Sequence, residues 1–225
     1  MTPANLSLAD LMENFGFSAR PHDKPRVAVS ACLLGQKVRY DGDHKHDLLI
    51  SGELGGWFEW VPVCPEVGIG LPVPRPPIQV EDVGGVMRVR GVDDPVTDVT
   101  DALRRYALEV DGAIDGIILK ARSPSCAVGT TPVIRDGQDT GGVTDGAFAA
   151  ALHQRFPALA RRDEEALRDT DTRNAFVLQC HMYRRWRERR LDGDVIGRWQ
   201  DMCFKLGSEP FQVLAERLQH WRGMA

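Results

Sequence analysis

Three short apolar runs in the first half of the chain are typical of buried parallel strands. They span residues 26–32, 57–63 and 114–119. Before the third run, residues 96–110 carry apolar side chains at helical spacing, and Asp94 is placed to cap that helix. The order strand, helix, strand predicts a right-handed βαβ unit and therefore a parallel sheet.

Segments rich in glycine or proline separate the other elements of this region. Residues 78–81 and 86–92 flank a segment that contains a Gly-Gly pair, which predicts a β-hairpin. The glycines and prolines of residues 67–77 favour a structured loop, and residues 133–143 are also predicted to be mostly loop. A short helix is expected at residues 48–54. The pattern thus predicts one antiparallel pair beside the parallel strands.

Helical patterns dominate from residue 144 onward. Residues 144–155 predict a helix that is capped by the threonine or the aspartate at its start. A charged stretch follows, and then three more helical patterns at residues 172–190, 194–206 and 209–221. The predicted fold class is therefore α/β, with an open, largely parallel sheet, flanking helices and a small β-hairpin, followed by a C-terminal α-helical appendage.

The change in character after residue 156 suggests a division into three parts. We assign residues 1–25 to an N-terminal extension, residues 26–156 to the α/β domain and residues 157–225 to an Arg-rich helical C-terminal segment. A chain of 225 residues is long enough for one α/β domain with such an appendage.

Composition places the chain among ordinary globular proteins, with 43% hydrophobic and 27% charged residues. No stretch approaches the roughly 20 apolar residues of a membrane span, and the first residues lack the pattern of a secretory signal. We therefore expect a cytoplasmic protein with no membrane partner. The net charge of −4 hides a local contrast, because residues 155–190 contain ten arginines, no lysine and six acidic residues.

Three of the five cysteines are associated with the ends of the apolar runs. Cys32 closes the first run, Cys64 comes directly after the second, and Cys126 lies in the Pro-containing turn that follows the third. An odd number of cysteines without an export signal argues against a disulfide framework. The carboxyl ends of parallel strands converge on one crevice, and thiolates bind soft metals and iron-sulfur clusters. Their spacing matches no local ferredoxin or zinc-finger pattern, so core packing stays open as the alternative. Cys180 and Cys203 fall within helical patterns and are assigned to the core.

An acid and a hydroxyl accompany two of these cysteines. Glu66 follows Cys64 by two positions, and Ser123 precedes Cys126 by three, with a proline inside each motif. A turn in the core would need neither group, so we regard both as candidates for proton transfer and water binding. The alternative for Glu66 is a cap of the next turn. Ser125 is given only a backbone-bonding role in its turn.

Five motifs in chain order resemble the bacterial thiouracil desulfidases of the TudS type, and the likeness runs from about residue 26 to residue 156. The motifs are Ser30-Ala-Cys-Leu-Leu-Gly35, Arg39-Tyr-Asp-Gly42, Val63-Cys-Pro-Glu-Val67, Gly70-Leu-Pro-Val-Pro-Arg75 and Lys120-Ala-Arg-Ser-Pro-Ser-Cys126. The combination is specific, although no single motif is.

The resemblance implies a 4Fe-4S cluster that is held by Cys32, Cys64 and Cys126 and leaves one iron open. In that family the open iron takes the sulfur of a thiocarbonyl compound and water replaces this sulfur at carbon, with no net redox change. The expected substrate is a small thiolated pyrimidine such as 4-thiouracil. The resemblance also assigns the catalytic roles to Glu66, as the acid and base, and to Ser123, which orients the water.

Further predictions concern substrate binding. Arg75, Tyr40 and Lys120 flank the motifs and are candidates to hold a carbonyl or anionic group or to line the pocket, although solvation at the surface is the usual state of such side chains. His44 and His46 have the spacing of metal ligands, but their polar loop favours exposed histidines.

Two alternatives remain open at this point. Residues 184–190 combine clustered arginines with a tryptophan on a predicted helix, which is compatible with docking of tRNA that carries 4-thiouridine, or with a solvated helix full of ion pairs. A non-catalytic iron-sulfur or metal-binding redox sensor would need the three cysteines but not Glu66 and Ser123. The oligomeric state is not predicted.

Overall fold

The computed structural model describes residues 6–18 and 23–223, so part of the N-terminal extension, residues 1–5 and 19–22, lies outside the described residues. Its strands are β1 (Arg26–Ser30), β2 (Glu59–Val63), β3 (Ile78–Val83), β4 (Val86–Gly91), β5 (Gly116–Leu119), β6 (Thr131–Arg135), β7 (Gln138–Thr144) and β8 (Ala160–Asp163). Its α-helices are α1 (Leu8–Asn14), α2 (Pro65–Gly68), α3 (Thr100–Glu109), α4 (Ala147–Arg155), α5 (Thr170–Arg187), α6 (Gly193–Leu206) and α7 (Glu209–Arg222). Short 3₁₀ or π turns occur at η2 (Ala31–Leu34), η3 (Leu49–Glu53), η4 (Leu54–Gly56) and η5 (Ala166–Arg168).

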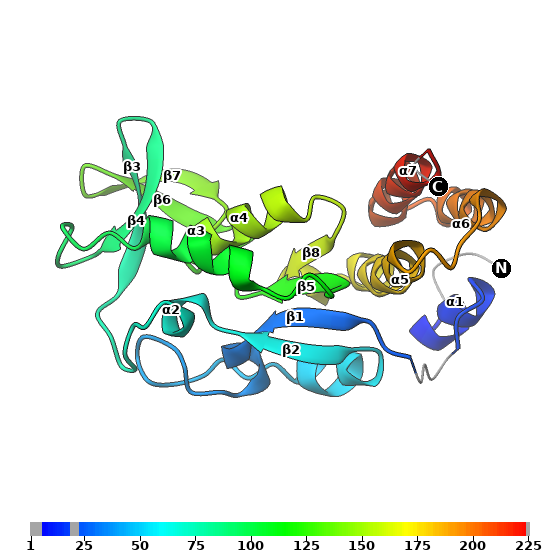
Figure 1. Ribbon diagram of the computed structural model, residues 1–225, viewed down its shortest axis with the longest axis horizontal. Coiled ribbons are helices and arrows are strands. Elements are labelled where there is room, and N and C mark those ends of the chain that lie inside the picture. Colours follow the sequence, from blue (N-terminus) through cyan, green and yellow to red (C-terminus); the bar gives the residue numbers. More distant parts are fainter. Residues whose placement is uncertain (1–5, 19–22, 224–225) are drawn as a thin grey trace.

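The central sheet has the strand order β2-β1-β5-β8, and all its neighbouring strands are parallel (Figure 1). Its interior residues, such as Val27, Val29 and Ile118, are fully buried, as expected of a parallel sheet covered on both faces. The predicted α/β fold and its three parallel strands are confirmed. The fourth strand, β8, was not predicted because its sequence, Ala-Arg-Arg-Asp, has no apolar run. The sheet therefore takes its last strand from the segment assigned above to the C-terminal part.

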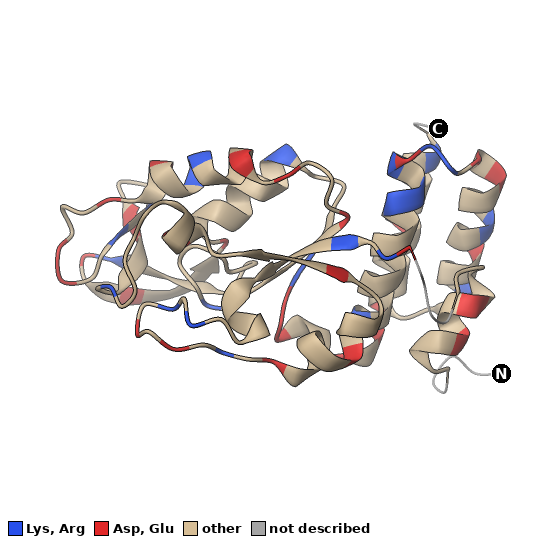
Figure 2. Cartoon of the chain, turned by 60° about the horizontal axis from the view of Figure 1, so that its bottom comes forward, with Lys and Arg blue, Asp and Glu red and all other residues tan. Residues whose placement is uncertain are grey.

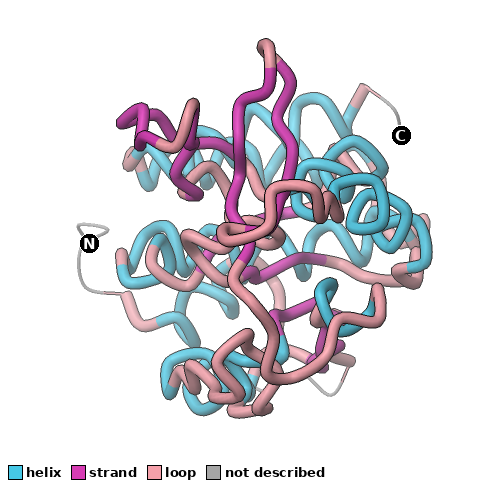
Figure 3. The backbone as a smooth tube through the Cα atoms, turned by 90° about the vertical axis from the view of Figure 1, so that its left-hand side faces the viewer, coloured by secondary structure: helices cyan, strands magenta, loops and turns pink. Residues whose placement is uncertain are grey.

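A second four-stranded sheet has the order β4-β3-β6-β7, and its β3–β4 hairpin confirms the one predicted from the Gly-Gly pair. Figure 3 shows a long strand pair that rises above the rest of the molecule. The prediction that residues 133–143 are mostly loop is wrong, because β6 and β7 form an antiparallel pair there. Strand β7 is exposed along almost its whole length, so no alternation of apolar and polar residues marks it in the sequence.

Two helix starts differ from the predictions. Helix α3 begins at Thr100 rather than near residue 96, because Asp94 instead accepts hydrogen bonds from Val96 N and Thr97 Oγ1 in a turn ahead of the helix. Helix α4 has Gly146 as its N-cap, with no side-chain cap from the threonine or aspartate before it. In Figure 1, α3 and α4 lie side by side above the strands of the central sheet.

The three predicted C-terminal helices are confirmed as α5, α6 and α7. Helix α5 packs directly on the central sheet, because Gly116 of β5 leaves room for the side chains of Cys180 and Phe176. The N-terminal extension joins the same helices: Trp199 Nε1 donates to the Phe15 carbonyl at 2.9 Å. None of the helices in the described part of the chain is long and apolar enough to cross a membrane.

Candidate active site

One pocket, with a volume of about 370 Å³, lies at the carboxyl ends of β2, β1 and β5, the three adjacent strands of the central sheet. Cys32 lies in the 3₁₀ turn that follows β1, and Cys64 is the N-cap of α2 directly after β2. Cys126 lies in the turn that follows β5. All three cysteines line this pocket. The structure thus brings together the three cysteines that the sequence places at strand ends.

The turn that carries Cys126 is tightly held. Ser123 Oγ accepts hydrogen bonds from the backbone N–H groups of Cys126, at 3.1 Å, and Ser125, at 3.3 Å. The first N–H groups of α4 also form hydrogen bonds with this turn. Ala147 N donates to the Pro124 carbonyl, and Phe148 N donates to the Ser125 carbonyl. The turn therefore caps the helix, and the helix in return fixes the turn.

Gly146 is required where α4 meets this turn. A Cβ atom at this position would lie 2.4 Å from the carbonyl carbon of Ser125 and 2.7 Å from Cys126 N. Only a glycine allows the two backbones to approach so closely. The position of Cys126 therefore depends on a residue twenty positions later in the sequence.

The pocket thiols are shielded from water but have cations nearby. Burial raises the pKa of Cys32 to about 11, and burial also raises the pKa of Cys64 and, more strongly, that of Cys126. Arg39 and Lys120 act in the opposite direction on the pKa of Cys32 because their positive charges favour the thiolate. None of the three thiols forms a disulfide. Binding of a soft metal would release the thiol protons, because the thiolate is the ligand.

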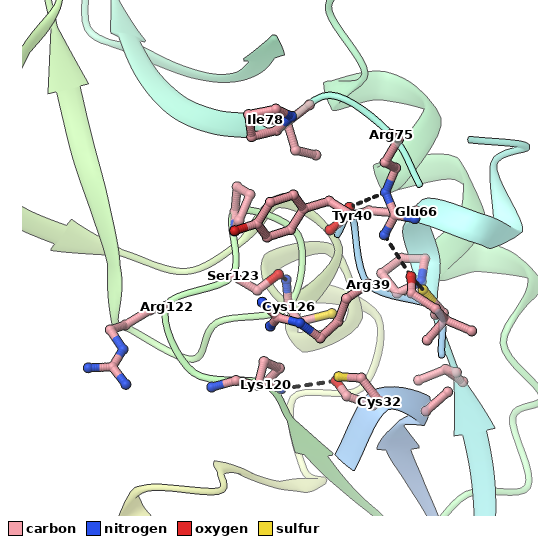
Figure 4. A pocket seen from close by; sticks show the side chains of 18 of the residues that line it. Cys32, Arg39, Tyr40, Glu66, Arg75, Ile78, Lys120, Arg122, Ser123 and Cys126 are labelled. Atoms are coloured by element: carbon pink, nitrogen blue, oxygen red, sulfur yellow. Dashed lines mark hydrogen bonds and ion pairs between the residues drawn. The ribbon is translucent and has the colours of Figure 1, made fainter. Parts of the chain in front are cut away.

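Glu66 points toward the pocket from the first turn of α2 (Figure 4), and each of its carboxylate oxygens accepts a hydrogen bond. Arg75 Nε donates to Glu66 Oε2 at 2.8 Å, and Ser125 Oγ donates to Glu66 Oε1 at 2.9 Å. The side chains of Arg75 and Glu66 are only 3% and 13% exposed. Arg75 is thus a buried partner of Glu66 and not a solvated surface side chain.

The other predicted substrate-binding residues also line the pocket. Tyr40 is 44% exposed, and the Arg39 guanidinium lies 5.4 Å from the centre of its ring. The Lys120 ammonium is paired with the buried Glu164 and donates to the Ala121 carbonyl. Tyr40 therefore offers an accessible ring face, whereas Lys120 already has anionic and carbonyl partners.

The two histidines of the polar loop do not line the pocket. His46 Nε2 lies 2.8 Å from Ser51 Oγ, and the backbone N–H of His46 donates to His44 Nδ1. These local contacts agree with the preference for histidines outside the metal site.

Sequence reasoning missed two residues of this region. Ser125 is fully buried and bonds to Glu66, whereas it had been given only a backbone role. Glu164 accepts hydrogen bonds from both the ammonium of Lys120 and the backbone of Ala121. The position of Ser125 beside Cys126 was the available signal, but the partnership of Glu164 depends on the unpredicted strand β8.

The three thiols of the pocket are of the ligand type that iron-sulfur clusters use. In the described part of the chain, no three His, Cys, Asp or Glu side chains are grouped closely enough to hold one metal ion. A cluster of several irons binds each thiolate at a different iron, so its ligands lie further apart. Cys32, Cys64 and Cys126 are spread over the wall of one pocket, with Arg39, Arg75 and Lys120 nearby to balance thiolate charge.

The family model described as 2-thiouracil desulfurase matches residues 27–164. The chain belongs to the 2-thiouracil desulfurase family. The match confirms the resemblance seen in the motifs, and it covers every residue predicted for the site and also strand β8.

Two known proteins are similar to this chain. The chain is 32% identical over 114 residues to the uncharacterized protein YbbK of Bacillus subtilis. This match covers 46% of this chain and 74% of YbbK. Among solved structures, it is similar to the 4Fe-4S-dependent thiouracil desulfidase TudS, with 33% identity, a TM-score of 0.49, and coverage of 64% of this chain and 94% of that one.

The arginines at the end of α5 mostly have partners within the molecule. Arg184 pairs with Asp23 and Glu188, and Arg187 pairs with the fully buried Asp115. The Arg185 guanidinium lies 4.2 Å from the centre of the Phe17 ring. Figure 2 shows basic and acidic residues interspersed on these helices. Of the two interpretations of this segment, these contacts favour the helix with ion pairs over a surface that docks tRNA. Docking of tRNA stays a prediction.

Proposed function

We propose that the chain removes sulfur from a thiolated pyrimidine such as 4-thiouracil and replaces it with oxygen from water. The proposal takes its reaction from the 2-thiouracil desulfurase family and its residues from the pocket described above. The observation that carries it is the meeting of three thiols and one anchored carboxylate in a single cavity. A core turn or a packing site would have no use for that combination.

Cys32, Cys64 and Cys126 would hold a 4Fe-4S cluster through their thiolates, the usual ligands of such a cluster. The similar protein TudS is described as a 4Fe-4S-dependent thiouracil desulfidase. When bound, such a cluster supplies a Lewis-acidic iron for the substrate sulfur, which makes the adjoining ring carbon more electrophilic. Cys32 and Cys126 are buried and Cys64 is partly buried, so the side of the pocket that would hold the cluster is largely shielded from solvent.

Glu66 is the residue best placed to move the proton of the attacking water. Each of its oxygens has one donor from the protein, so each retains a lone pair that can accept a further hydrogen bond. It would accept the proton as the water attacks and return it to the leaving sulfur or to the ring. Ser123 Oγ accepts two backbone hydrogen bonds, and its own hydrogen can therefore be donated into the pocket to orient the water.

The opposite wall of the pocket suits a planar ring. Tyr40 presents its half-exposed ring, and Ile78 adds apolar surface on the same side (Figure 4). A pyrimidine is flat and weakly polar on its faces, so it can stack on the tyrosine while its edge points to Glu66.

The experiment is anaerobic reconstitution of the pure protein with iron and sulfide, followed by incubation with 4-thiouracil. We expect bound iron and acid-labile sulfide, and release of sulfide with formation of uracil. Glu66→Gln should keep the iron, but its sulfide release should fall by about 100-fold or more because the proton acceptor is lost. A wild type that binds no iron under these conditions would contradict the proposal. A wild type that binds the cluster but releases no sulfide would favour the redox sensor.

A further inference from the structure

We infer that Ser125 and Arg75 are positioning residues that hold the carboxylate of Glu66 in place for proton transfer. The inference rests on the proposed function and adds residues to it, since Ser125 was expected only to support its turn and Arg75 to bind substrate. Each contacts one oxygen of Glu66, and the two contacts come from different loops of the pocket.

The hydroxyl of Ser125 has a fixed direction. Its side chain is fully buried, and its backbone carbonyl accepts hydrogen bonds from Phe148 N at 3.1 Å and Ala149 N at 3.3 Å. Its own N–H donates to Ser123 Oγ. The backbone of Ser125 is therefore tied to the first turn of α4, and Oγ donates to Glu66 Oε1 from a rigid support.

Arg75 is anchored on three sides. Besides its 2.8 Å bond to Glu66 Oε2, its Nη1 donates to the Pro72 carbonyl at 3.2 Å and its Nη2 to the Val38 carbonyl at 2.9 Å. Its backbone N–H donates to the Tyr40 carbonyl at 2.8 Å. A guanidinium with partners on all three nitrogens is held as part of the pocket wall, and its bond to a carboxylate is of the strong, charge-assisted kind.

The two donors fix the carboxylate plane of Glu66. A carboxylate with a donor on one oxygen can still rotate, but a second donor on the other oxygen from a different loop removes this freedom. The Ser125–Glu66 bond also connects the two cysteine-bearing turns, because Ser125 precedes Cys126 and Glu66 lies two residues after Cys64. The base and two of the three proposed cluster ligands are thereby kept in one geometry.

The test compares Ser125→Ala with the wild type and with Ser51→Ala, a serine whose hydroxyl bonds to His46 and to the Asp47 carbonyl away from the pocket. Iron content, the visible absorption spectrum, KM and kcat per bound cluster are measured with 4-thiouracil. We expect Ser125→Ala to lower kcat per cluster about 10- to 100-fold and to change KM by less than about threefold, because substrate contacts remain. Ser51→Ala should match the wild type.

A double-mutant cycle shows whether Ser125 acts through Glu66. In a Glu66→Gln background, measured in single turnover with excess enzyme, the further change Ser125→Ala should lower the rate by no more than about twofold. An equal loss in both backgrounds, or an unchanged kcat per cluster in the single variant, would overturn the inference.

A crystal structure of Ser125→Ala gives a readout that does not depend on turnover. We expect the Glu66 carboxylate to rotate away from its wild-type position, and an unmoved carboxylate would overturn the inference. Failure of the proposed function is recognised separately, because in that case the wild type itself would bind the cluster and release no sulfide.

Discussion

The five free cysteines form two groups that burial alone does not separate. Cys32 and Cys126 at the pocket are buried, as are Cys180 and Cys203 among the helices. Burial also raises the pKa of thiols in both groups, to about 11 for Cys32 and about 12 for Cys203. A buried cysteine with a raised pKa is therefore equally compatible with a ligand and with core packing.

The surroundings of the two groups differ. The pocket thiols lie at the ends of parallel strands. The charges of Arg39 and Lys120 lower the pKa of Cys32, and the charge of Glu66 raises the pKa of Cys126. Cys180 packs on the backbone of Gly116 and also has the charges of Asp115 and Arg162 nearby, whereas burial is the whole cause of the pKa shift of Cys203. Charged neighbours therefore do not separate the two groups, and the comparison teaches that position at the carboxyl edge of the sheet, in the wall of a pocket, is what marks a chemical site.

The largest effect should separate Cys126 from Cys180. After anaerobic reconstitution we expect Cys126→Ala to bind no iron above background and to release no sulfide, because only two thiolates would remain for the cluster. Cys180→Ala should keep both properties, while its free energy of unfolding falls by about 1–2 kcal/mol, the usual cost of a small cavity.

Iron analysis, sulfide release and urea unfolding measure these outcomes on matched preparations. If Cys126→Ala kept the full iron content, Cys126 would not be a cluster ligand and the division into pocket and core cysteines would be wrong. The division would also be wrong if Cys180→Ala lost iron at a temperature where the protein stays folded.

A smaller effect should separate the two glycines that support these cysteines. Gly146→Ala would place a Cβ atom 2.4 Å from the carbonyl carbon of Ser125, and Gly116→Ala would place one 2.4 Å from Cys180 Sγ. Both changes should lower the free energy of unfolding by about 1–3 kcal/mol through overpacking. Only Gly146→Ala should also lower the bound iron, because it displaces the turn of Cys126; equal iron in the two variants would contradict this expectation.

Much of the fold follows from short-range pattern. The three apolar runs at β1, β2 and β5 predicted the parallel sheet. Strands β1 and β5 are buried on both faces and therefore have continuous apolar sequence, whereas β2 is the edge strand and is only partly buried. Strands β7 and β8 were missed because neither has such a run: β7 is exposed and β8 carries two arginines. Their pairing is decided by neighbours far along the chain, which local sequence does not report.

The site was predicted unevenly for a related reason. Strand ends can be recognised locally, so the convergence of Cys32, Cys64 and Cys126 was expected from the sheet rule. The partners of Glu66 were not expected, because Arg75 and Ser125 reach it through the tertiary fold. The roles of Glu66 and Ser123 themselves came from the family resemblance and stay predictions.

The smallest effect concerns how well the region around Cys180 is shielded from water. The adjacent His181 reports this shielding through the pH dependence of the free energy of unfolding. Burial, together with the nearby charges of Arg185 and Arg184, lowers the pKa of His181 from 6.5 to about 3, against the opposing effects of a hydrogen bond with the Trp57 backbone and the charge of Asp23. The folded state thus binds fewer protons than the unfolded state below pH 6.5. Stability is complete above that pH and is lost as the pH falls toward 3.

Between pH 7.5 and pH 5.5 this residue alone should cost about 1.4 kcal/mol of unfolding free energy. His181→Phe, in a site already lined by the aromatic rings of Phe17 and Phe58, should remove that part of the acid dependence. The control is His220→Phe at an exposed position of α7, which keeps His181 and should keep the wild-type dependence. Urea unfolding at both pH values measures the difference. If His181→Phe lost as much stability as the wild type between the two pH values, His181 would not be shielded from water in the folded state, and the contrast between the dry helices around Cys180 and the open pocket would be weaker than the structure indicates.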